Sequence, residues 1–294
     1  MSDYFRQNAV KTSFANSESW IMLSSIEQQI KQKIERVGTP LKDWDIRINY
    51  GIKTGFNNAF IIDGTKRKEL MDMDPKSEEI IRPILRGRDI QKYYKDFSDL
   101  YIINVHNGIK SKNLQPIKID DYPAIKRHLD VFYKELAKRS DKGITPYNLR
   151  NCDYLYDFNQ NKIIYPNMTK FLPFVYDDGQ FLTNQKCYII TGNNIEYLTA
   201  FFNSSLFKYC FRDNFPELQG GTRELSKIFF DKIKILQVSE EINSSFKNLI
   251  TKLQQFKRKG IKTKEIEVEI DHHIFKLYDL TVEEINEIGF IEIQ

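Results

Sequence analysis

Two short segments of the chain bring together side chains that can bind an anion. In Gly51-Ile52-Lys53-Thr54-Gly55, two glycines bracket an ammonium and a hydroxyl group, and Arg86-Gly87-Arg88 presents two guanidinium groups further along. Glycine lets the backbone approach another molecule closely, and all three groups donate hydrogen bonds to anionic oxygens. The segments therefore indicate an anion-binding surface. The same residue types also fit an ordinary hairpin and a solvated basic loop.

Apolar periodicity predicts the elements that hold these segments. The range 41–62 has the pattern of loop, strand, turn and strand, which puts Lys53 and Thr54 on the turn. A helix is predicted at 24–37, because Ser24 and Glu27 form a capping box and Gly38 suits the C-cap. Further helices are predicted at 76–81, 121–138 and 194–211, and further strands at 100–105, 162–165, 174–176, 181–183, 186–191 and 228–235. Asp178-Gly179 indicates a hairpin between two of these strands.

After residue 239 the pattern changes to two helical stripes of apolar residues and a short capped helix that begins at Thr281. We expect an N-terminal arm or linker at 1–20, a main domain at 21–238 and a C-terminal helical region at 239–294. The predicted fold class is α+β, with a mixed or antiparallel sheet, flanking helices and a C-terminal helical hairpin.

Composition excludes several classes of protein. Hydrophobic residues make up 41% of the chain and aromatic residues 13%, which is enough for a packed core. The net charge is only +4, with 44 basic and 40 acidic residues, so a nucleic-acid surface would be confined to one face. The three cysteines are widely spaced, which fits free thiols in a reducing cytoplasm. No apolar run is long enough to span a membrane, and we expect a cytoplasmic protein.

Catalytic motifs are missing from the sequence. The chain contains no Pro-Pro and no Gly-x-Gly, so it lacks both the Asn-Pro-Pro-Tyr type of amino-methylation motif and a glycine-rich cofactor loop. Asp74-Pro75-Lys76 has the residue types of a nuclease motif, but Pro75 would disrupt the strand that the motif needs. His272-His273 is the one histidine pair, and neighbouring positions on a helix do not face each other. We expect no catalytic and no metal-binding residues in this chain.

Several motifs resemble those of a known family. Gly-Ile-Lys-Thr-Gly-Phe-Asn, followed by Arg-Pro-Ile-Leu-Arg-Gly-Arg-Asp-Ile, is similar to the TaqI-like C-terminal specificity domain. That domain follows the methyltransferase domain in type IIG restriction–modification enzymes and related adenine-N6 DNA methyltransferases. The order of the following segments also fits: Trp20-Ile21 before Ser24-Ser25, Gly38-Thr39-Pro40-Leu41 with Trp44, Lys162-Ile163-Ile164-Tyr165-Pro166, Cys187-Tyr188-Ile189-Ile190-Thr191-Gly192, Tyr197-Leu198 with Phe202-Asn203-Ser204, and Gly220-Gly221 before Lys227-Ile228-Phe229-Phe230.

The resemblance implies a target recognition domain that binds double-stranded DNA and determines the sequence recognised. S-adenosylmethionine and Mg²⁺ would then be cofactors of the parent enzyme only, and the partner would be its methyltransferase or endonuclease domain or subunit. Arginine and lysine can read guanine, and asparagine and glutamine can read adenine, while all of them can bind phosphates. The candidate DNA-binding residues are Lys53, Thr54, Arg86, Arg88, Arg139, Lys142, Asn148, Arg150, Lys170, Asn184, Lys186, Gln219, Thr222 and Arg223.

We expect Lys53, Thr54, Arg86 and Arg88 to position the DNA backbone, and the loop with Gln219 and Arg223 to touch bases. A structural role for Arg223 is an open alternative. A solvated surface charge remains the alternative for each residue taken singly. Two other classes of function also remain open. One is a non-catalytic protein-interaction subunit that uses its apolar helical stripes, and the other is a stand-alone nuclease with an unrecognised site.

Overall fold

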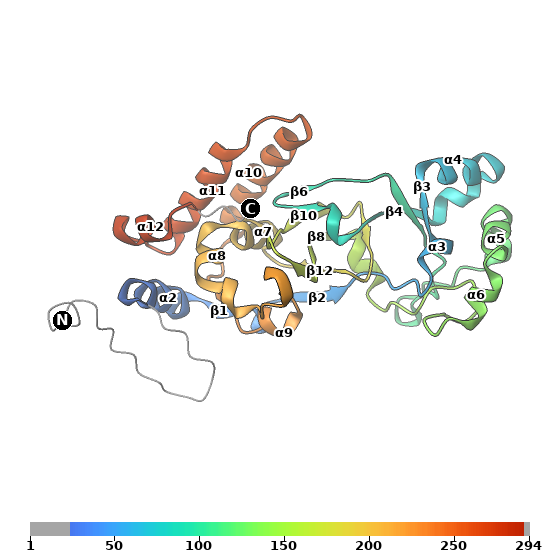
Figure 1. The fold of residues 1–294 in the computed structure, drawn as a ribbon, viewed down its shortest axis with the longest axis horizontal. Helices are drawn as coiled ribbons and strands as arrows, with labels where there is room; N and C mark the ends of the chain where they lie inside the picture. Colours follow the sequence, from blue (N-terminus) through green and yellow to red (C-terminus); the bar gives the residue numbers. More distant parts are fainter. Residues whose placement is uncertain (1–23, 291–294) are drawn as a thin grey trace.

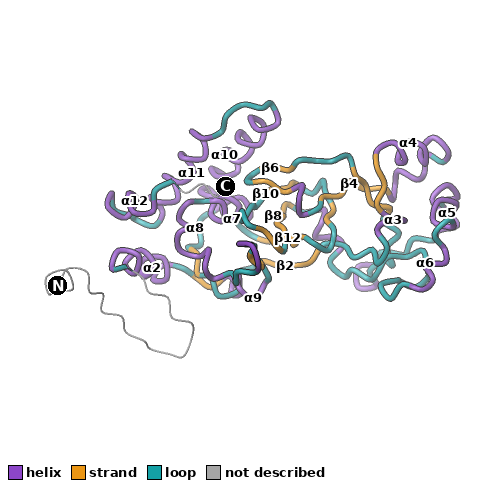
Figure 2. Tube along the Cα trace, in the orientation of Figure 1, coloured by secondary structure: helices purple, strands orange, loops and turns teal. Residues whose placement is uncertain are grey.

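The computed structural model describes residues 24–290 of the chain. The predicted arm at 1–20 and the Trp20-Ile21 segment lie outside these residues. The molecule is elongated, with a sheet in the middle, long helices at one end and shorter helices at the other (Figure 1). Figure 2 shows the same arrangement by element type, with most strands in the central part.

The central sheet is antiparallel, in the order β10-β8-β12-β2. Its strands are β2 (Ile46–Tyr50), β8 (Asn161–Pro166), β10 (Val175–Asp178) and β12 (Cys187–Gly192). Side chains alternate across the sheet, so Ile163 and Tyr165 enter one hydrophobic core, while Ile164 enters the other. Because both faces are buried, these strands have continuous apolar sequences rather than alternating ones.

A second sheet, in the order β11-β4-β7-β3, forms the framework of the smaller end. It contains β3 (Ile61–Asp63), β4 (Ile81–Leu85), β7 (Leu100–Ile103) and β11 (Leu182–Thr183), and β11 pairs with β4 in parallel. The helices of this end are α3 (Asn57–Phe60), α4 (Gly64–Met73), α5 (Pro123–Asp130) and α6 (Tyr133–Lys138). The chain returns to this sheet at β11 after building most of the central sheet, so the two ends are interwoven along the sequence.

The opposite end is built from α2 (Ser25–Val37), α7 (Ile195–Asn203), α8 (Ser205–Phe211), α10 (Glu240–Arg258), α11 (Lys264–Leu277) and α12 (Val282–Ile288). The predicted capping boxes of α2 and α12 are both confirmed. The hydroxyl oxygens of Tyr197 and Tyr278 lie 3.1 Å apart in the core and join α7 to the end of α11. The apolar stripes of α10 and α11 are buried in the same core as the central sheet. The division at residue 239 stays a prediction.

Three two-stranded ladders and a short helix complete the framework. The ladders are β1 (Thr39–Pro40) with β14 (Lys234–Ile235), β5 (Ile90–Gln91) with β6 (Tyr94–Lys95), and β9 (Met168–Thr169) with β13 (Arg223–Glu224). The helix α9 (Lys227–Phe230) precedes β14.

The structure differs from several local predictions. The hairpin expected at Asp178-Gly179 is wrong, because β10 pairs with β8 whereas β11 joins the other sheet. The helix expected at 194–211 is divided at Ser204, whose hydroxyl accepts a hydrogen bond from the backbone of Phe207 and starts a second helix. The helix expected at 121–138 is likewise divided, after Asp130. The strand expected at 228–235 begins as helix α9, and the segment at 76–81 is a 3₁₀ helix that ends at Ile80.

A buried ionic cluster joins three elements at the middle of the molecule. Asp177 on β10 accepts hydrogen bonds from Lys162 on β8, at 2.6 Å, and from Lys95 on β6. Burial by itself would raise the pKa of Asp177, but the two ammonium groups hold that pKa below its ordinary value. The cluster attaches the β5–β6 ladder to the central sheet, and its one carboxylate is shared by the two buried ammonium groups.

The fold class is α+β, as the sequence predicts, with a C-terminal helical region. In residues 24–290, no helix has both the length and the apolar character needed to cross a membrane.

Candidate nucleic-acid interface

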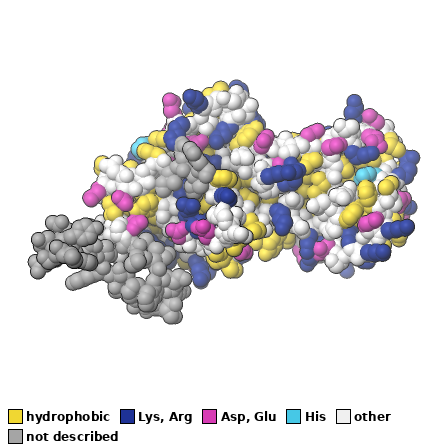
Figure 3. Space-filling view, in the orientation of Figure 1, with side chains coloured by type: hydrophobic (Ala, Val, Ile, Leu, Met, Phe, Trp, Pro, Cys, Tyr) yellow, Lys and Arg dark blue, Asp and Glu magenta, His cyan; other side chains and the backbone are white. Residues whose placement is uncertain are grey.

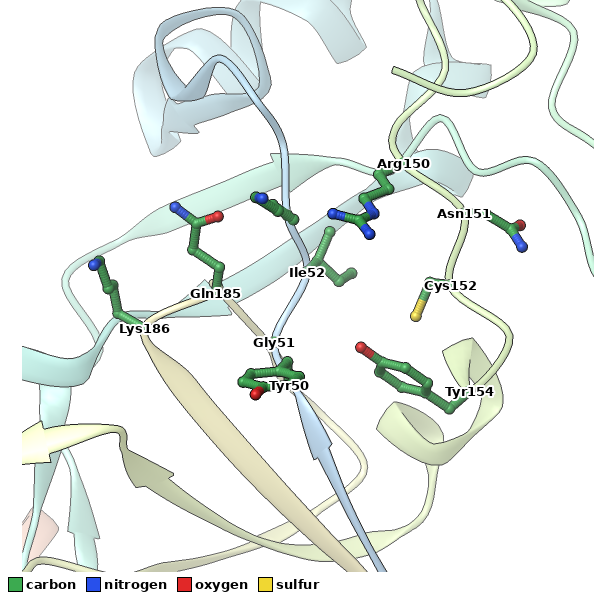
Figure 4. Close-up of a pocket in the computed structure, with 10 residues that line it drawn as sticks. Tyr50, Gly51, Ile52, Arg150, Asn151, Cys152, Tyr154, Gln185 and Lys186 are labelled. Carbon is green, nitrogen blue, oxygen red and sulfur yellow. The ribbon is translucent and has the colours of Figure 1, made fainter. Parts of the chain in front are cut away.

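The first candidate site is a hollow of about 460 Å³ at the end of β2, which we call the β2 hollow. Its walls come from the end of β2 and the following loop, from the loop before β8, and from the turn between β11 and β12 (Figure 4). The lining residues are Tyr50, Gly51, Ile52, Lys53, Arg150, Asn151, Cys152, Tyr154, Gln185 and Lys186. Lys53, Arg150 and Lys186, which are distant in sequence, thus come together on one rim.

Asp141 holds two of these cations. One carboxylate oxygen lies 2.9 Å from the Lys53 ammonium, and the other accepts a hydrogen bond from the Arg150 guanidinium at 3.0 Å. The hydrogen bond from Lys53 is the main reason that the pKa of Asp141 is lowered from its ordinary value. Both cations remain well exposed, at 43% for Lys53 and 57% for Arg150, so an incoming anion can reach them.

A second hollow, of about 800 Å³, lies beside β9, and we call it the β9 hollow. Arg88, Lys170 and Thr222 line it, together with the side chains of Met168 and Phe171, each about half exposed. Within the described part of the chain, Arg88 and Lys170 have no ion pair or hydrogen bond through their side chains. Their charges are therefore available to an external partner.

The two hollows meet at the turn between β11 and β12. The backbone N–H of Asn167 donates to the carbonyl of Lys186 at 2.9 Å, which attaches this turn to the segment that follows β8. Gly87 packs against the same place, since a Cβ there would lie 3.3 Å from Pro166 and 3.7 Å from the Lys186 carbonyl. The linings of the two hollows thus lie next to each other at this turn. We call their exposed cations the basic face: Lys53, Arg88, Arg150, Lys170 and Lys186.

Basic and acidic side chains are interspersed over the face of the molecule that Figure 3 shows. Figure 3 shows lysine and arginine over the middle and over the α4–α6 end, with acidic side chains among them. The local arrangement of the basic face, rather than the net charge of the chain, therefore determines where an anionic polymer could bind.

Three of the predicted residues support the loops from inside. Arg139 is buried and donates to the backbone carbonyls of Thr54, Pro146 and Asn148. Its guanidinium also lies over the Phe60 ring, 4.5 Å from the centroid, and burial lowers the pKa of Arg139 to about 10. The side chains of Thr54 and Asn148 are buried and hydrogen-bonded as well. These bonds make the three residues supports of the 139–150 loop and its neighbours, and their expected contact with DNA stays a prediction.

The side chain of Arg86 is also hydrogen-bonded within the protein. Its guanidinium makes two hydrogen bonds to buried Asp89, at 3.0 and 2.9 Å. Asp89 in turn accepts the backbone N–H of Arg86, so the pair shapes the turn that presents Arg88. Of the two arginines only Arg88 is exposed, and the expectation that both position the DNA backbone stays a prediction.

Arg223 does not have the exposed position expected of a base-reading side chain. Its guanidinium is buried and donates to the carbonyls of Arg212 and Phe215, at 3.2 and 2.7 Å. It also pairs with Asp213 and Glu217. Arg223 therefore anchors the segment from which the Gln219–Gly221 turn projects. Of the two residues expected to touch bases, Gln219 is the exposed one, and it lies next to Gly220 at a φ of +75°.

The remaining predicted residues lie around the basic face or apart from it. Asn184 is partly buried, and its side-chain oxygen accepts the backbone N–H of Lys186, so it shapes the turn that carries Lys186. Lys142 is exposed and donates to the carbonyl of Ala137 on α6. Thr222 lies at the edge of the β9 hollow.

The sequence analysis did not select Asp141, Tyr50 or Tyr154 as site residues. Tyr50 is the last residue of β2, and its exposed ring packs on Tyr188 with 4.6 Å between centroids. Its position directly before the Gly51–Gly55 segment was an available signal. No local pattern marks Asp141 or Tyr154, because they reach the hollow only through tertiary contacts.

The histidine pair lies on α11. His272 and His273 are exposed and lie against the rings of Phe290 and Phe246, respectively. Among residues 24–290, no group of three or more His, Cys, Asp or Glu side chains is arranged to hold a metal ion.

Solved structures similar to this chain come from restriction–modification enzymes. One is the type IIL restriction–modification enzyme MmeI in complex with DNA, with a TM-score of 0.58 and 11% identity over 86% of this chain and 36% of that chain. Another is the type IIG restriction endonuclease BpuSI, with a TM-score of 0.50 and 14% identity over 87% of this chain and 34% of that chain. These likenesses concern the fold, and the chain spans only about a third of the length of either enzyme.

None of the curated proteins matches the chain. The family model of the TaqI-like C-terminal specificity domain matches residues 82–235, which is more than half of the chain. The match includes most of β4, all of β7, β8, β10, β11 and β12, and the turns that carry Arg88, Arg150, Lys170 and Lys186. The chain belongs to the TaqI-like C-terminal specificity domain family.

Proposed function

We propose that this chain recognises double-stranded DNA and serves as the target-recognition part of a restriction–modification enzyme. The observation that carries this proposal is the basic face, where five exposed cations from separate loops line two adjoining hollows. Membership of a specificity-domain family supports it. Backbone phosphates would bind Lys53, Arg88, Arg150, Lys170 and Lys186, and these contacts would position the duplex.

Sequence reading requires side chains that reach base edges. Gln219 projects from a glycine-rich turn, and a Cβ at Gly220 or Gly221 would have nothing within 4 Å, so the turn has space around it. Gln185 lies on the exposed turn beside Lys186. Both side chains carry amides, which can pair with adenine in the major groove. We assign base contact to these two residues.

The finer assignment is to a type IIG enzyme or an adenine-N6 methyltransferase. In this proposal the catalytic groups, S-adenosylmethionine and Mg²⁺ belong to a methyltransferase or endonuclease part, in the same polypeptide or in a partner subunit. The purified chain should then transfer no methyl groups from S-adenosylmethionine to DNA and should not cleave DNA with Mg²⁺. Methyl incorporation above the blank would contradict this assignment.

Titration of a labelled duplex with the purified chain tests DNA binding. The affinity should fall steeply as salt rises, because each neutralised phosphate releases counterions. Lys186→Ala should weaken binding equally for all DNA sequences and flatten the slope of log K against log salt by about one. Lys68→Ala is the matched control, since Lys68 is exposed on α4 and lines neither hollow. An affinity that does not change with salt would refute the proposal.

The protein-interaction alternative relied on the apolar helical stripes. These stripes are buried in the core of the described chain, so no specific observation favours that alternative.

A further inference from the structure

The β2 hollow differs from the rest of the basic face because an aromatic and apolar surface lies below its cations. Ile52, Cys152 and the ring of Tyr154 line it, and Tyr50 contributes a ring that is 57% exposed. In Figure 4 the Tyr154 hydroxyl and the Cys152 sulfur point toward the space beside Tyr50. A phosphate-binding surface has no need of such a lining, because phosphate is fully polar.

The size of the hollow restricts what can occupy it. Its volume of about 460 Å³ is in the range of small-molecule sites, which begin at about 300 Å³. A duplex can lie across the rim but cannot enter. One unstacked base with its sugar can enter, and the exposed Tyr50 ring provides a face on which a base can stack.

The chemistry of the lining fits binding rather than catalysis. Burial raises the pKa of Cys152 to about 12, so its thiol is protonated at neutral pH and is a poor nucleophile. Burial is also the main reason that the pKa of Tyr154 is raised to about 12, so its hydroxyl keeps its proton. Both groups can take part in hydrogen bonds with a ligand.

The rim supplies the complementary charge. Lys53 and Arg150 are joined through Asp141, and the ammonium of Lys186 has no ion pair or hydrogen bond among the described residues. An anionic group above the hollow would therefore meet three cations and one carboxylate. A nucleotide has a flat base attached to a phosphate. The aromatic lining of the hollow can contact the base, while the cations of the rim can bind the phosphate.

We propose that the β2 hollow binds one unstacked nucleotide, with its base against Tyr50 and its phosphate at the Lys53–Arg150–Lys186 rim. The nucleotide belongs to the bound DNA, so this inference rests on the proposed function. A free mononucleotide has the same chemistry and is the other source that the experiment must distinguish.

The test compares two labelled duplexes, one fully paired and one with a single bulged 2-aminopurine nucleotide. The wild-type chain should bind the bulged duplex about tenfold more tightly, and stacking should quench the emission of the 2-aminopurine. Tyr50→Leu should abolish the preference and the quenching but keep the affinity for the paired duplex and its salt slope. Because Tyr50 is largely exposed, this variant should fold. Tyr133→Leu is the control, since Tyr133 is an exposed ring on α6 outside both hollows.

Equal affinity of the wild-type chain for the two duplexes would overturn the inference and leave the proposed function standing. Loss of the preference in Tyr133→Leu would also overturn it, because the effect would not be local to the hollow. If the chain binds neither duplex, the proposed function fails. Calorimetric titration with adenosine monophosphate then shows whether the β2 hollow binds a free nucleotide. Binding of adenosine monophosphate by the wild-type chain but not by Tyr50→Leu would support a site for free nucleotides. Absence of binding by the wild-type chain would overturn the inference.

Discussion

Replacing Asp141 with asparagine should strengthen DNA binding, because it removes the carboxylate that competes with DNA for Lys53 and Arg150. The two oxygens of Asp141 lie 2.9 and 3.0 Å from these cations. In the wild-type chain this group of three side chains carries one positive charge, and in the variant it carries two. The hydrogen bond from Lys53 lowers the pKa of Asp141, so the carboxylate is ionised throughout the neutral range.

The size of the effect follows from the exposure of the pairs. Ion pairs with exposed partners contribute about 0.2–1 kcal/mol each, so two pairs correspond to at most about 2 kcal/mol. A phosphate that binds these cations in the wild-type chain must displace interactions of this size. We therefore expect Asp141→Asn to bind duplex DNA about three- to tenfold more tightly at low salt, where about 1.4 kcal/mol is tenfold. The salt slope should steepen by about 0.9, as for one added phosphate contact.

Fluorescence anisotropy of a labelled duplex at several salt concentrations measures both quantities. The control is Asp72→Asn, which changes the net charge equally but replaces an exposed residue on α4 that lines neither hollow. Thermal melting of both variants shows whether loss of the pairs has weakened the fold. The reasoning is refuted if Asp141→Asn binds DNA no better than Asp72→Asn, since the gain would then reflect total charge alone.

Two further predictions concern the buried charges. Asp177→Asn should lower the free energy of unfolding in urea by about 3–5 kcal/mol, because Lys95 and Lys162 would keep their buried charges without a carboxylate. A loss below about 1 kcal/mol would contradict this reasoning. The folded-state pKa of Asp177 lies below the ordinary 3.8. The ionised carboxylate therefore contributes to stability above about pH 4, and this contribution is lost as the pH falls through the folded pKa. The stability of Asp177→Asn should accordingly depend less steeply on acid pH than that of the wild-type chain. Arg223→Ala should lower the melting temperature and make the 212–222 segment more sensitive to protease, because it removes bonds to Arg212 and Phe215. If Arg223→Ala melts like the wild-type chain, the anchoring role is wrong.

The starts of two helices were among the features that the sequence predicted well. Ser24 with Glu27 and Thr281 with Glu284 each form the expected capping box, because such a box depends only on residues three positions apart. The strands of the central sheet were also predicted, since their apolar runs reflect burial on both faces. Pairing was predicted less well. Asp178-Gly179 is a good local hairpin signal, but β11 gains more by joining β4 in the other sheet.

The candidate site shows the same division between local and long-range information. The sequence by itself determined which segments carry cations and amides. It placed Lys53, Arg88, Arg150 and Lys170 on connections between elements and Lys186 at the start of a predicted strand. Residue type does not determine where a long side chain points, because arginine serves equally well as a surface cation and as a buried donor to several carbonyls.

Only the tertiary structure decided between these two uses. It directs Arg139 and Arg223 toward backbone carbonyls inside the protein, and leaves Arg88 and Lys186 exposed. It also brings Asp141 to Lys53 and places Tyr154 opposite Tyr50, although these residues are far apart in the chain. The physical reason is that exposure and pairing depend on contacts between distant segments, which form only when the two sheets have packed together.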